Sequence, residues 1–172
     1  MIKLTNYTNI YRTFAKNLIE SSFPEEERPD FDELISRKSP EYKFNIITIN
    51  DENCGIIGYW EFDDFIHIEH FAVSPNMRSS GIGGEFLNNF FSQTNKLIVL
   101  EVEVPDNEIS IRRIKFYERH GMHFNVYHYM QPSYKTKEFV MQQHIMSSKK
   151  LTESEFETIR DVLYEKVYLI KS

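Results

Sequence analysis

The sequence predicts one domain of the mixed α/β (α+β) class, a three-layer arrangement with a mostly antiparallel central sheet and helices on both of its faces. The first observation behind this is the order of the segments: strand, two helices, three strands, helix, strand, helix, two strands, helix. The second is the polar turn at 51–54 between two apolar strands, which is typical of an antiparallel hairpin. The third is the length of 172 residues, which suits a single domain over residues 1–172.

The N-terminal half holds one strand, two helices and three further strands. Ile10, Phe14 and Leu18 recur at helical spacing in the first helix. In the second helix acidic residues come first, and Arg37 and Lys38 come near the end, an order that suits the helix dipole. The expected elements are a strand at 2–5, helices within 7–20 and 24–40, and strands at 44–50, 55–62 and 66–75.

The C-terminal half begins with a glycine-rich corner and a helix. Ser79 or Ser80 can cap this helix at its N-terminus, and Gly121 can end the helix that follows later. The expected elements are a helix through 86–93, a strand at 97–104, a helix at 110–120, strands at 122–130 and 138–146, and a closing helix at 153–168.

Composition and charge exclude several classes of protein. A formal net charge of −6 argues against a duplex nucleic-acid partner and favours a cationic molecule or a basic peptide. There is no apolar run of about 18 residues, so no transmembrane helix is expected. The N-terminus lacks a secretory pattern, and the single cysteine, Cys54, is interpreted as a structural or incidental thiol; we therefore expect a cytoplasmic protein.

The run RSSGIGG, residues 78–84, is the strongest signal for a ligand. It lies between a strand-like and a helix-like segment, where bare amides at a helix N-terminus can bind a phosphate group. Glu85 and Phe86 follow Gly84, so the Lys-Ser/Thr pair of a P-loop is missing. A dinucleotide fingerprint that starts at Gly81 needs glycine where Phe86 stands. Both nucleotide motifs are thereby excluded.

Arg78, Gly81 and Gly83 match the pattern Q/R-x-x-G-x-G/A. With the strand before it, the segment 68–84 resembles the fourth strand and pyrophosphate loop of the GNAT N-acetyltransferase superfamily. The segments 100–105 and 116–124 are similar to the fifth strand and the helix-to-strand region of that family. The resemblance implies transfer of an acetyl group from acetyl-CoA to a primary amine, with acetyl-CoA as co-substrate and no metal.

The resemblance also implies which residues hold the coenzyme. The open edge of the fourth strand would pair with the pantetheine arm, and a backbone amide near Phe71 would polarise the thioester carbonyl. Ser110 stands where the family often has an asparagine that touches the coenzyme. The implied coenzyme-binding residues are Phe71, Ala72, Val73, Arg78, Ser79, Ser80, Gly81, Ile82, Gly83, Gly84 and Ser110.

An alkylamine acceptor has a pKa of about 10.4, so a group that takes its proton is valuable at neutral pH. Glu69 and His67 lie two residues apart in a strand and are expected on one face. Relatives use acids or histidines there, so we expect Glu69 as the base or the residue that positions water, with His67 as the other candidate. His70 has the opposite parity and is expected to be packed and hydrogen-bonded; this alternation argues against a metal site.

Tyr117 takes the place of the family tyrosine that protonates the departing thiolate, although its ring could serve only to pack on the sheet. Because Cys54 lies outside the motifs, we expect direct transfer in a ternary complex rather than an acyl-cysteine.

The acceptor side is less determined. The acceptor is expected to be a small-molecule or peptide amine. The acidic segment FPEEER, residues 23–28, either recruits a cation or is the solvated start of a helix. A homodimer is one option for the assembly. The rival function is an acyl-CoA-binding sensor or interaction module without turnover, which needs neither Glu69 nor Tyr117.

Overall fold

The computed structural model describes residues 1–170, and its contacts divide them into two compact units. Unit 1 consists of Met1–Glu25 and Pro29–Ile98, and unit 2 of Glu26–Arg28 and the chain from Val99 on. Each unit is described by itself. Among the described residues, no helix is both long enough and apolar enough to cross a membrane.

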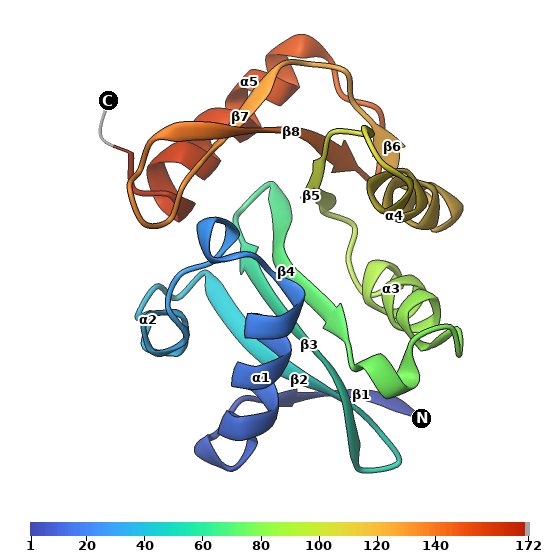
Figure 1. The fold of residues 1–172 in the computed structure, drawn as a ribbon. Helices are drawn as coiled ribbons and strands as arrows, with labels where there is room; N and C mark the ends of the chain where they lie inside the picture. The colour runs from blue at the N-terminus through green and yellow to red at the C-terminus, as the bar shows by residue number, and fades with distance from the viewer. Residues whose placement is uncertain (171–172) are drawn as a thin grey trace. The chain divides into compact units, whose positions relative to one another are not determined.

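Unit 1 is built on four antiparallel strands that pair in chain order (Figure 1). Asn50 and Asp51 both have positive φ, 49° and 68°, in the tight turn between the second and third strands, which confirms the hairpin predicted around residues 51–54. The strands are β1 (Ile2–Asn6), β2 (Tyr42–Ile49), β3 (Glu52–Glu61) and β4 (Phe65–Val73).

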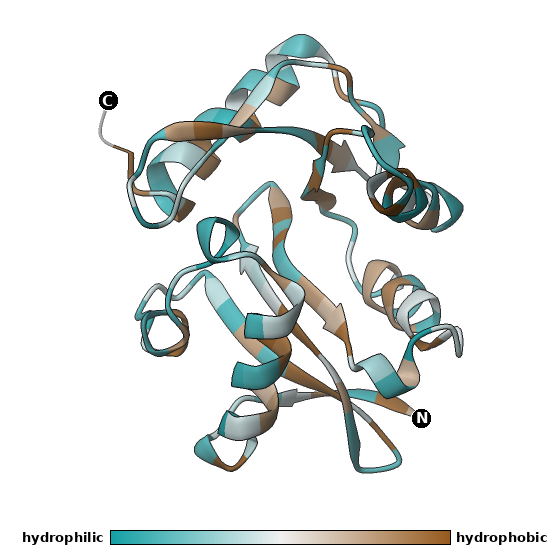
Figure 2. Cartoon of the chain, viewed as in Figure 1, coloured by the Kyte–Doolittle hydropathy of each residue, from teal (hydrophilic) through white to brown (hydrophobic). Residues whose placement is uncertain are grey.

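Helices cover both faces of this sheet. The helices α1 (Arg12–Ser22) and α2 (Phe31–Ile35) bury Ala15, Ile19 and Phe31 against Ile56 and Ala72. The third helix, α3 (Ile82–Ser92), contacts the opposite face, where Phe86 stacks on Phe71 and Phe90 contacts Tyr59. In Figure 2 brown and teal segments alternate along α1, the pattern of a helix that buries one side.

The second predicted helix is much shorter than residues 24–40. A single 3₁₀ turn forms at Glu25–Glu27 and α2 begins only at Phe31, because Pro29 between them has no amide to donate. Residues 36–41 are irregular, and this connection between α2 and β2 carries Arg37.

Unit 2 is centred on β8 (Phe139–Ser147). One edge of β8 pairs antiparallel with β5 (Leu97–Glu103), and the other edge pairs with β6 (His123–Phe124) and β7 (Tyr129–Pro132). The helices of this unit are α4 (Glu108–Arg119) and α5 (Glu153–Val162), the latter followed by a π-helical turn at Leu163–Val167.

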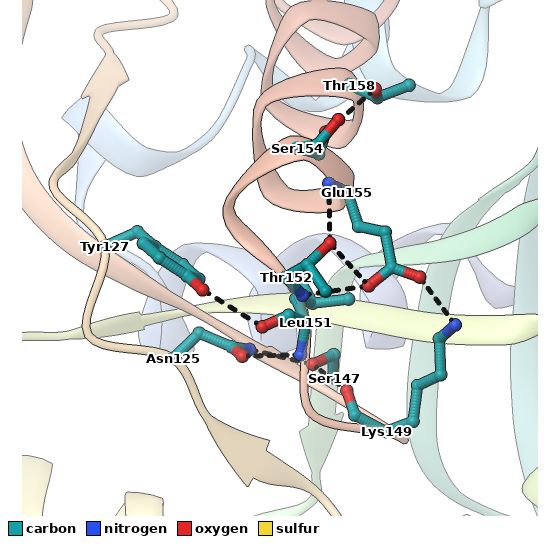
Figure 3. A network of polar contacts seen from close by, with 9 residues as sticks. All are labelled: Asn125, Tyr127, Ser147, Lys149, Leu151, Thr152, Ser154, Glu155 and Thr158. Carbon is teal, nitrogen blue, oxygen red and sulfur yellow. Dashed lines mark hydrogen bonds and ion pairs between the residues drawn. The ribbon is translucent and has the colours of Figure 1, made fainter.

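The strand predicted over 122–130 is interrupted after Phe124, where the side chain of the buried Asn125 bonds to β8 and to the start of α5. Its side-chain amide nitrogen donates to the Ile145 carbonyl at 2.9 Å. The same nitrogen donates to Ser147 Oγ at 2.8 Å, and the side-chain oxygen accepts from the Leu151 backbone amide (Figure 3). The adjacent capping box of Thr152 and Glu155 starts α5. Asn125 thereby joins β8 to the start of α5.

Candidate active site

The glycine-rich run forms a corner between β4 and α3 that is exposed from Arg78 to Gly81 and buried at Gly84. Gly81 is the N-cap of α3 with φ +85°, a left-handed conformation that favours glycine, and a Cβ there would meet nothing within 4 Å. The first-turn amides of residues 82–84 have no acceptor inside the helix and are available to an anion. Neither serine caps α3, contrary to the sequence prediction. Ser80 Oγ donates instead to the Met77 carbonyl at 2.5 Å.

Arg78 is tied to the end of β4. Its Nε donates to the Val73 carbonyl at 3.1 Å, and the residue is exposed. The segment Phe71–Val73 pairs with β3, where a Cβ on Gly55 would lie only 2.6 Å from the Ala72 carbonyl. Glycine at 55 therefore permits the close approach of β3 and β4 next to this corner.

A β-bulge at Glu69 changes which face His70 occupies. His67 pairs with Trp60 and His70 with Gly58, so β4 has one more residue than β3 between these pairs. Trp60 and Gly58 lie two residues apart and share a face, so His67 and His70 do too. Glu69 joins them, since Trp60 Nε1 donates to its carboxylate. The prediction that His70 lies opposite Glu69 is wrong, because a bulge breaks simple alternation.

Glu69 is buried in a network of donors. Both terminal nitrogens of Arg37 donate hydrogen bonds to the Glu69 carboxylate, at 2.6 Å and 3.1 Å, and Trp60 Nε1 donates to it at 2.9 Å. The Glu69 side chain is 1% exposed and that of Arg37 13%. His70 Nδ1 lies 3.9 Å from the carboxylate, while the His70 ring contacts Phe23 at the end of α1. Glu69 is thus fixed in position and charge-compensated.

Two aromatic rings frame the Arg37 guanidinium. Its central carbon lies 4.5 Å from the centre of the Tyr42 ring and 5.1 Å from that of Trp60. A Cβ on Gly58 would lie 2.7 Å from the Tyr42 hydroxyl, so glycine there makes room for the phenol. Burial, with the nearby Glu69 carboxylate, raises the pKa of Tyr42 well above its usual value. Tyr42 therefore stays neutral beside the ion pair.

Tyr117 and Ser110 both belong to α4 in unit 2. Burial raises the pKa of Tyr117 to about 12, so its phenol is protonated at neutral pH. The Ser110 hydroxyl is part of the capping box of α4, accepting from the Asn107 amide and donating to the Asn107 carbonyl at 3.0 Å. Ser110 therefore fixes where α4 begins.

The acidic segment 23–28 does not start a regular helix. Glu26 accepts a hydrogen bond from Ser133 Oγ at 2.7 Å and belongs to unit 2. Burial, with the nearby carboxylates of Glu103 and Glu101, raises the pKa of Glu27 to about 6 against the opposing effect of Arg113. Part of the segment is therefore packed into unit 2.

Residues 7–122 match the acetyltransferase (GNAT) family. The chain belongs to the GNAT family. The corner at 78–84 and β4 with Glu69 fall inside the matched range, as do Ser110 and Tyr117.

Three proteins illustrate the relationship. The Bacillus subtilis (strain 168) protein named "Putative acetyltransferase YjbC" is 33% identical over 121 residues, which are 67% of this chain and 62% of that protein's length. A structure named "Putative acetyltransferase from GNAT family", from Bacteroides thetaiotaomicron, has 34% identity and a TM-score of 0.90, covering 99% of each chain. It confirms the predicted α/β fold class.

The third is Arabidopsis thaliana Naa50 in complex with the bisubstrate analogue CoA-Ac-MVNAL. It has 18% identity and a TM-score of 0.59, covering 86% of this chain and 98% of that one, and it shows likeness of fold alone.

Sequence reasoning missed Arg37, Tyr42 and Trp60 as neighbours of Glu69. No local GNAT pattern marks them, because Arg37 lies 32 residues from Glu69 along the chain. The single cysteine, interpreted from the sequence as a structural or incidental thiol, is buried: Cys54 Sγ donates to the Ile47 carbonyl, and burial raises its pKa. Within residues 1–170, no group of three or more His, Cys, Asp or Glu side chains could hold a metal ion.

Proposed function

We propose that this chain transfers an acetyl group from acetyl-CoA directly to a primary amine within a ternary complex. The observation that carries the proposal is the strand-to-helix corner at 78–84, with Gly81 in a left-handed N-cap, inside the part that matches the GNAT family. The proposal includes one N-acyltransferase domain over residues 1–172 working in the cytoplasm. It leaves the assembly open, with a homodimer as one option.

On the donor side, the amides from Ser79 to Gly84 would bind the pyrophosphate, with Arg78 adding a fixed positive charge. Phe71, Ala72 and Val73 would pair with the amide groups of the pantetheine arm, and the amide near Phe71 would polarise the thioester carbonyl. Since the Ser110 hydroxyl caps α4, we expect this residue to act by placing the helix. The thioester itself supplies the activated acetyl group.

On the acceptor side, the amine nitrogen forms a bond to the carbonyl carbon as the carbon–sulfur bond breaks. The amine proton leaves through a water that Glu69 orients. Arg37 and Trp60 together already donate to both oxygens of the Glu69 carboxylate. This supports a Glu69 that orients the water rather than one that takes the amine proton itself. His67, on the same face of β4, is the other candidate for accepting the proton.

Tyr117 gives its phenolic proton to the departing thiolate and regains one from solvent. The support for this role is a phenol that burial keeps protonated at neutral pH.

The proposal is tested by measuring thiol release from acetyl-CoA with a panel of polyamines, amino acids and peptides. We expect release that depends on one class of primary amine. Tight coenzyme A binding with no acceptor-dependent release across the panel would instead support a binding module without turnover.

The role of Tyr117 is tested with Tyr117→Phe, which removes the proton donor and keeps the ring. We expect kcat to fall about 100-fold, while coenzyme A affinity changes less than about twofold. Tyr127→Phe is the matched control, because the Tyr127 hydroxyl donates to the Leu151 carbonyl, and its kcat should stay as in the wild type. Loss of coenzyme binding in Tyr117→Phe would make the residue structural.

A further inference from the structure

The irregular connection between α2 and β2 places one cation against the strand that carries Glu69. Arg37 lies on this connection and binds both oxygens of the Glu69 carboxylate. The guanidinium is nearly buried, at 13% side-chain exposure, and Glu69 more so, at 1%. A pair removed from water to this degree is screened far less than an exposed one.

We infer that Arg37 is a positioning residue for acyl transfer, which holds Glu69 ionised and in a single orientation for the acceptor's proton. The inference rests on the proposed function, because it assigns Glu69 a part in proton removal. Arg37 acts through Glu69 and needs no contact with either substrate.

The geometry requires arginine rather than a simple positive charge. A planar guanidinium delivers two parallel hydrogen bonds to a carboxylate, which an ammonium cannot. The rings of Tyr42 and Trp60 lie 4.5 Å and 5.1 Å from its central carbon and restrict where it can sit. Trp60 also donates to Glu69 directly, so the same ring positions both partners.

Several groups from neighbouring elements face Glu69. Arg37 comes from the α2–β2 connection, Tyr42 from β2 and Trp60 from β3, while His67 and His70 share its face of β4. The contact from the end of α1 is apolar, since Phe23 packs on His70. Arg37 supplies a permanent positive charge at Glu69, and its removal favours the protonated carboxyl.

The test compares pH profiles of kcat/KM for the wild type, Arg37→Met and Arg37→Lys. Without its counter-charge Glu69 takes up a proton more readily, so in Arg37→Met the acidic limb should move to higher pH by about one unit or more. On that limb, each unit of displacement lowers kcat/KM about tenfold. Arg37→Lys keeps the positive charge and loses the pair of parallel hydrogen bonds to the carboxylate. The acidic limb of its kcat/KM profile should therefore stay near the wild-type position, while its kcat is reduced.

Two further variants make the test specific. In the double variant Arg37→Met with Glu69→Gln no carboxyl remains to titrate, so the displaced limb should disappear although kcat stays low. Arg12→Met is the matched control. It removes the arginine of an exposed ion pair, in which the side chain of Arg12 is 40% exposed and that of Asp32 is 73% exposed. This variant should leave the pH profile of kcat/KM unchanged.

Coenzyme A affinity serves as the check on folding. If Arg37→Met binds no coenzyme, the comparison of Arg37→Lys with the wild type decides, and a kcat equal to the wild-type value overturns the inference. A uniform loss of activity at every pH in Arg37→Met also overturns it, because a purely structural residue acts in that way. A wild-type protein that acetylates no amine overturns the proposed function itself, which is a separate outcome.

Discussion

Two glutamates, one in each unit, accept hydrogen bonds from different kinds of donor. Glu69 on β4 is gripped by a guanidinium and an indole N–H in unit 1. Glu101 on β5 in unit 2 accepts from the hydroxyls of Tyr129 and Tyr168, the latter at 2.7 Å to both oxygens. Burial, with the nearby Glu101 carboxylate, raises the pKa of both phenols well above the usual value, so they stay neutral donors.

The difference lies in what each carboxylate loses when one partner is removed. Glu69 depends on an opposite charge, and a buried charge without its counter-charge is costly. At Glu101 the two phenols are neutral donors, and each of them contributes one hydrogen bond to a charged group. Removing one phenol from Glu101 takes away a hydrogen bond, whereas removing Arg37 from Glu69 takes away a charge. The largest effect should therefore come from unit 1.

Among these variants we expect Arg37→Met to have the largest effect on stability. We expect the free energy of unfolding to fall by about 3 kcal/mol at neutral pH, because the buried Glu69 carboxylate loses its counter-charge. The loss should shrink in acid, where Glu69 can take up a proton. Urea unfolding at neutral and acidic pH measures both values. An equal loss at the two pH values would show that packing, not charge, is what Arg37 contributes.

The matching change in unit 2 is Tyr168→Phe, which removes the hydroxyl that reaches both Glu101 oxygens. We expect a loss of about 2 kcal/mol in the free energy of unfolding, as for a hydrogen bond to a charged group. Tyr127→Phe removes a hydroxyl bonded to a neutral carbonyl and should cost about 1 kcal/mol by the same measurement. Equal losses in the two variants would remove the distinction between charged and neutral acceptors.

The smallest effect concerns Glu27, whose surroundings in unit 2 include other carboxylates. Its pKa is raised from 4.5 to about 6, so the folded state binds a proton more tightly than the unfolded state. The stability that this contributes is present in acid and is lost as pH rises from about 4.5 through about 6. With a discount for its partial exposure, Glu27→Gln should stabilise the protein by about 1 kcal/mol at pH 7. Thermal unfolding across this pH range should show that the stability of the wild type falls as pH rises, while the stability of the variant does not show this fall.

Much of the fold follows from local patterns. The hairpin of β2 and β3, the strand-to-helix corner and the helix that carries Tyr117 were predicted from periodicity, turn residues and the glycine run. The predictions failed where a side chain bonds far along the chain or a proline intervenes. Asn125 divides a predicted strand into β6 and β7, and Pro29 shortens the second helix to α2.

For the candidate site, the sequence identified the family of the chain and the corner at 78–84. This was possible because exposed backbone amides at the start of a helix leave a local pattern of glycines in the sequence. It also singled out Glu69. The tertiary structure alone decided how Glu69 is held. A bulge moves His70 to its side, and Arg37 arrives from 32 residues away. Hydrogen bonds between distant segments leave no period in the sequence, and one extra residue in a strand reverses every alternation beyond it.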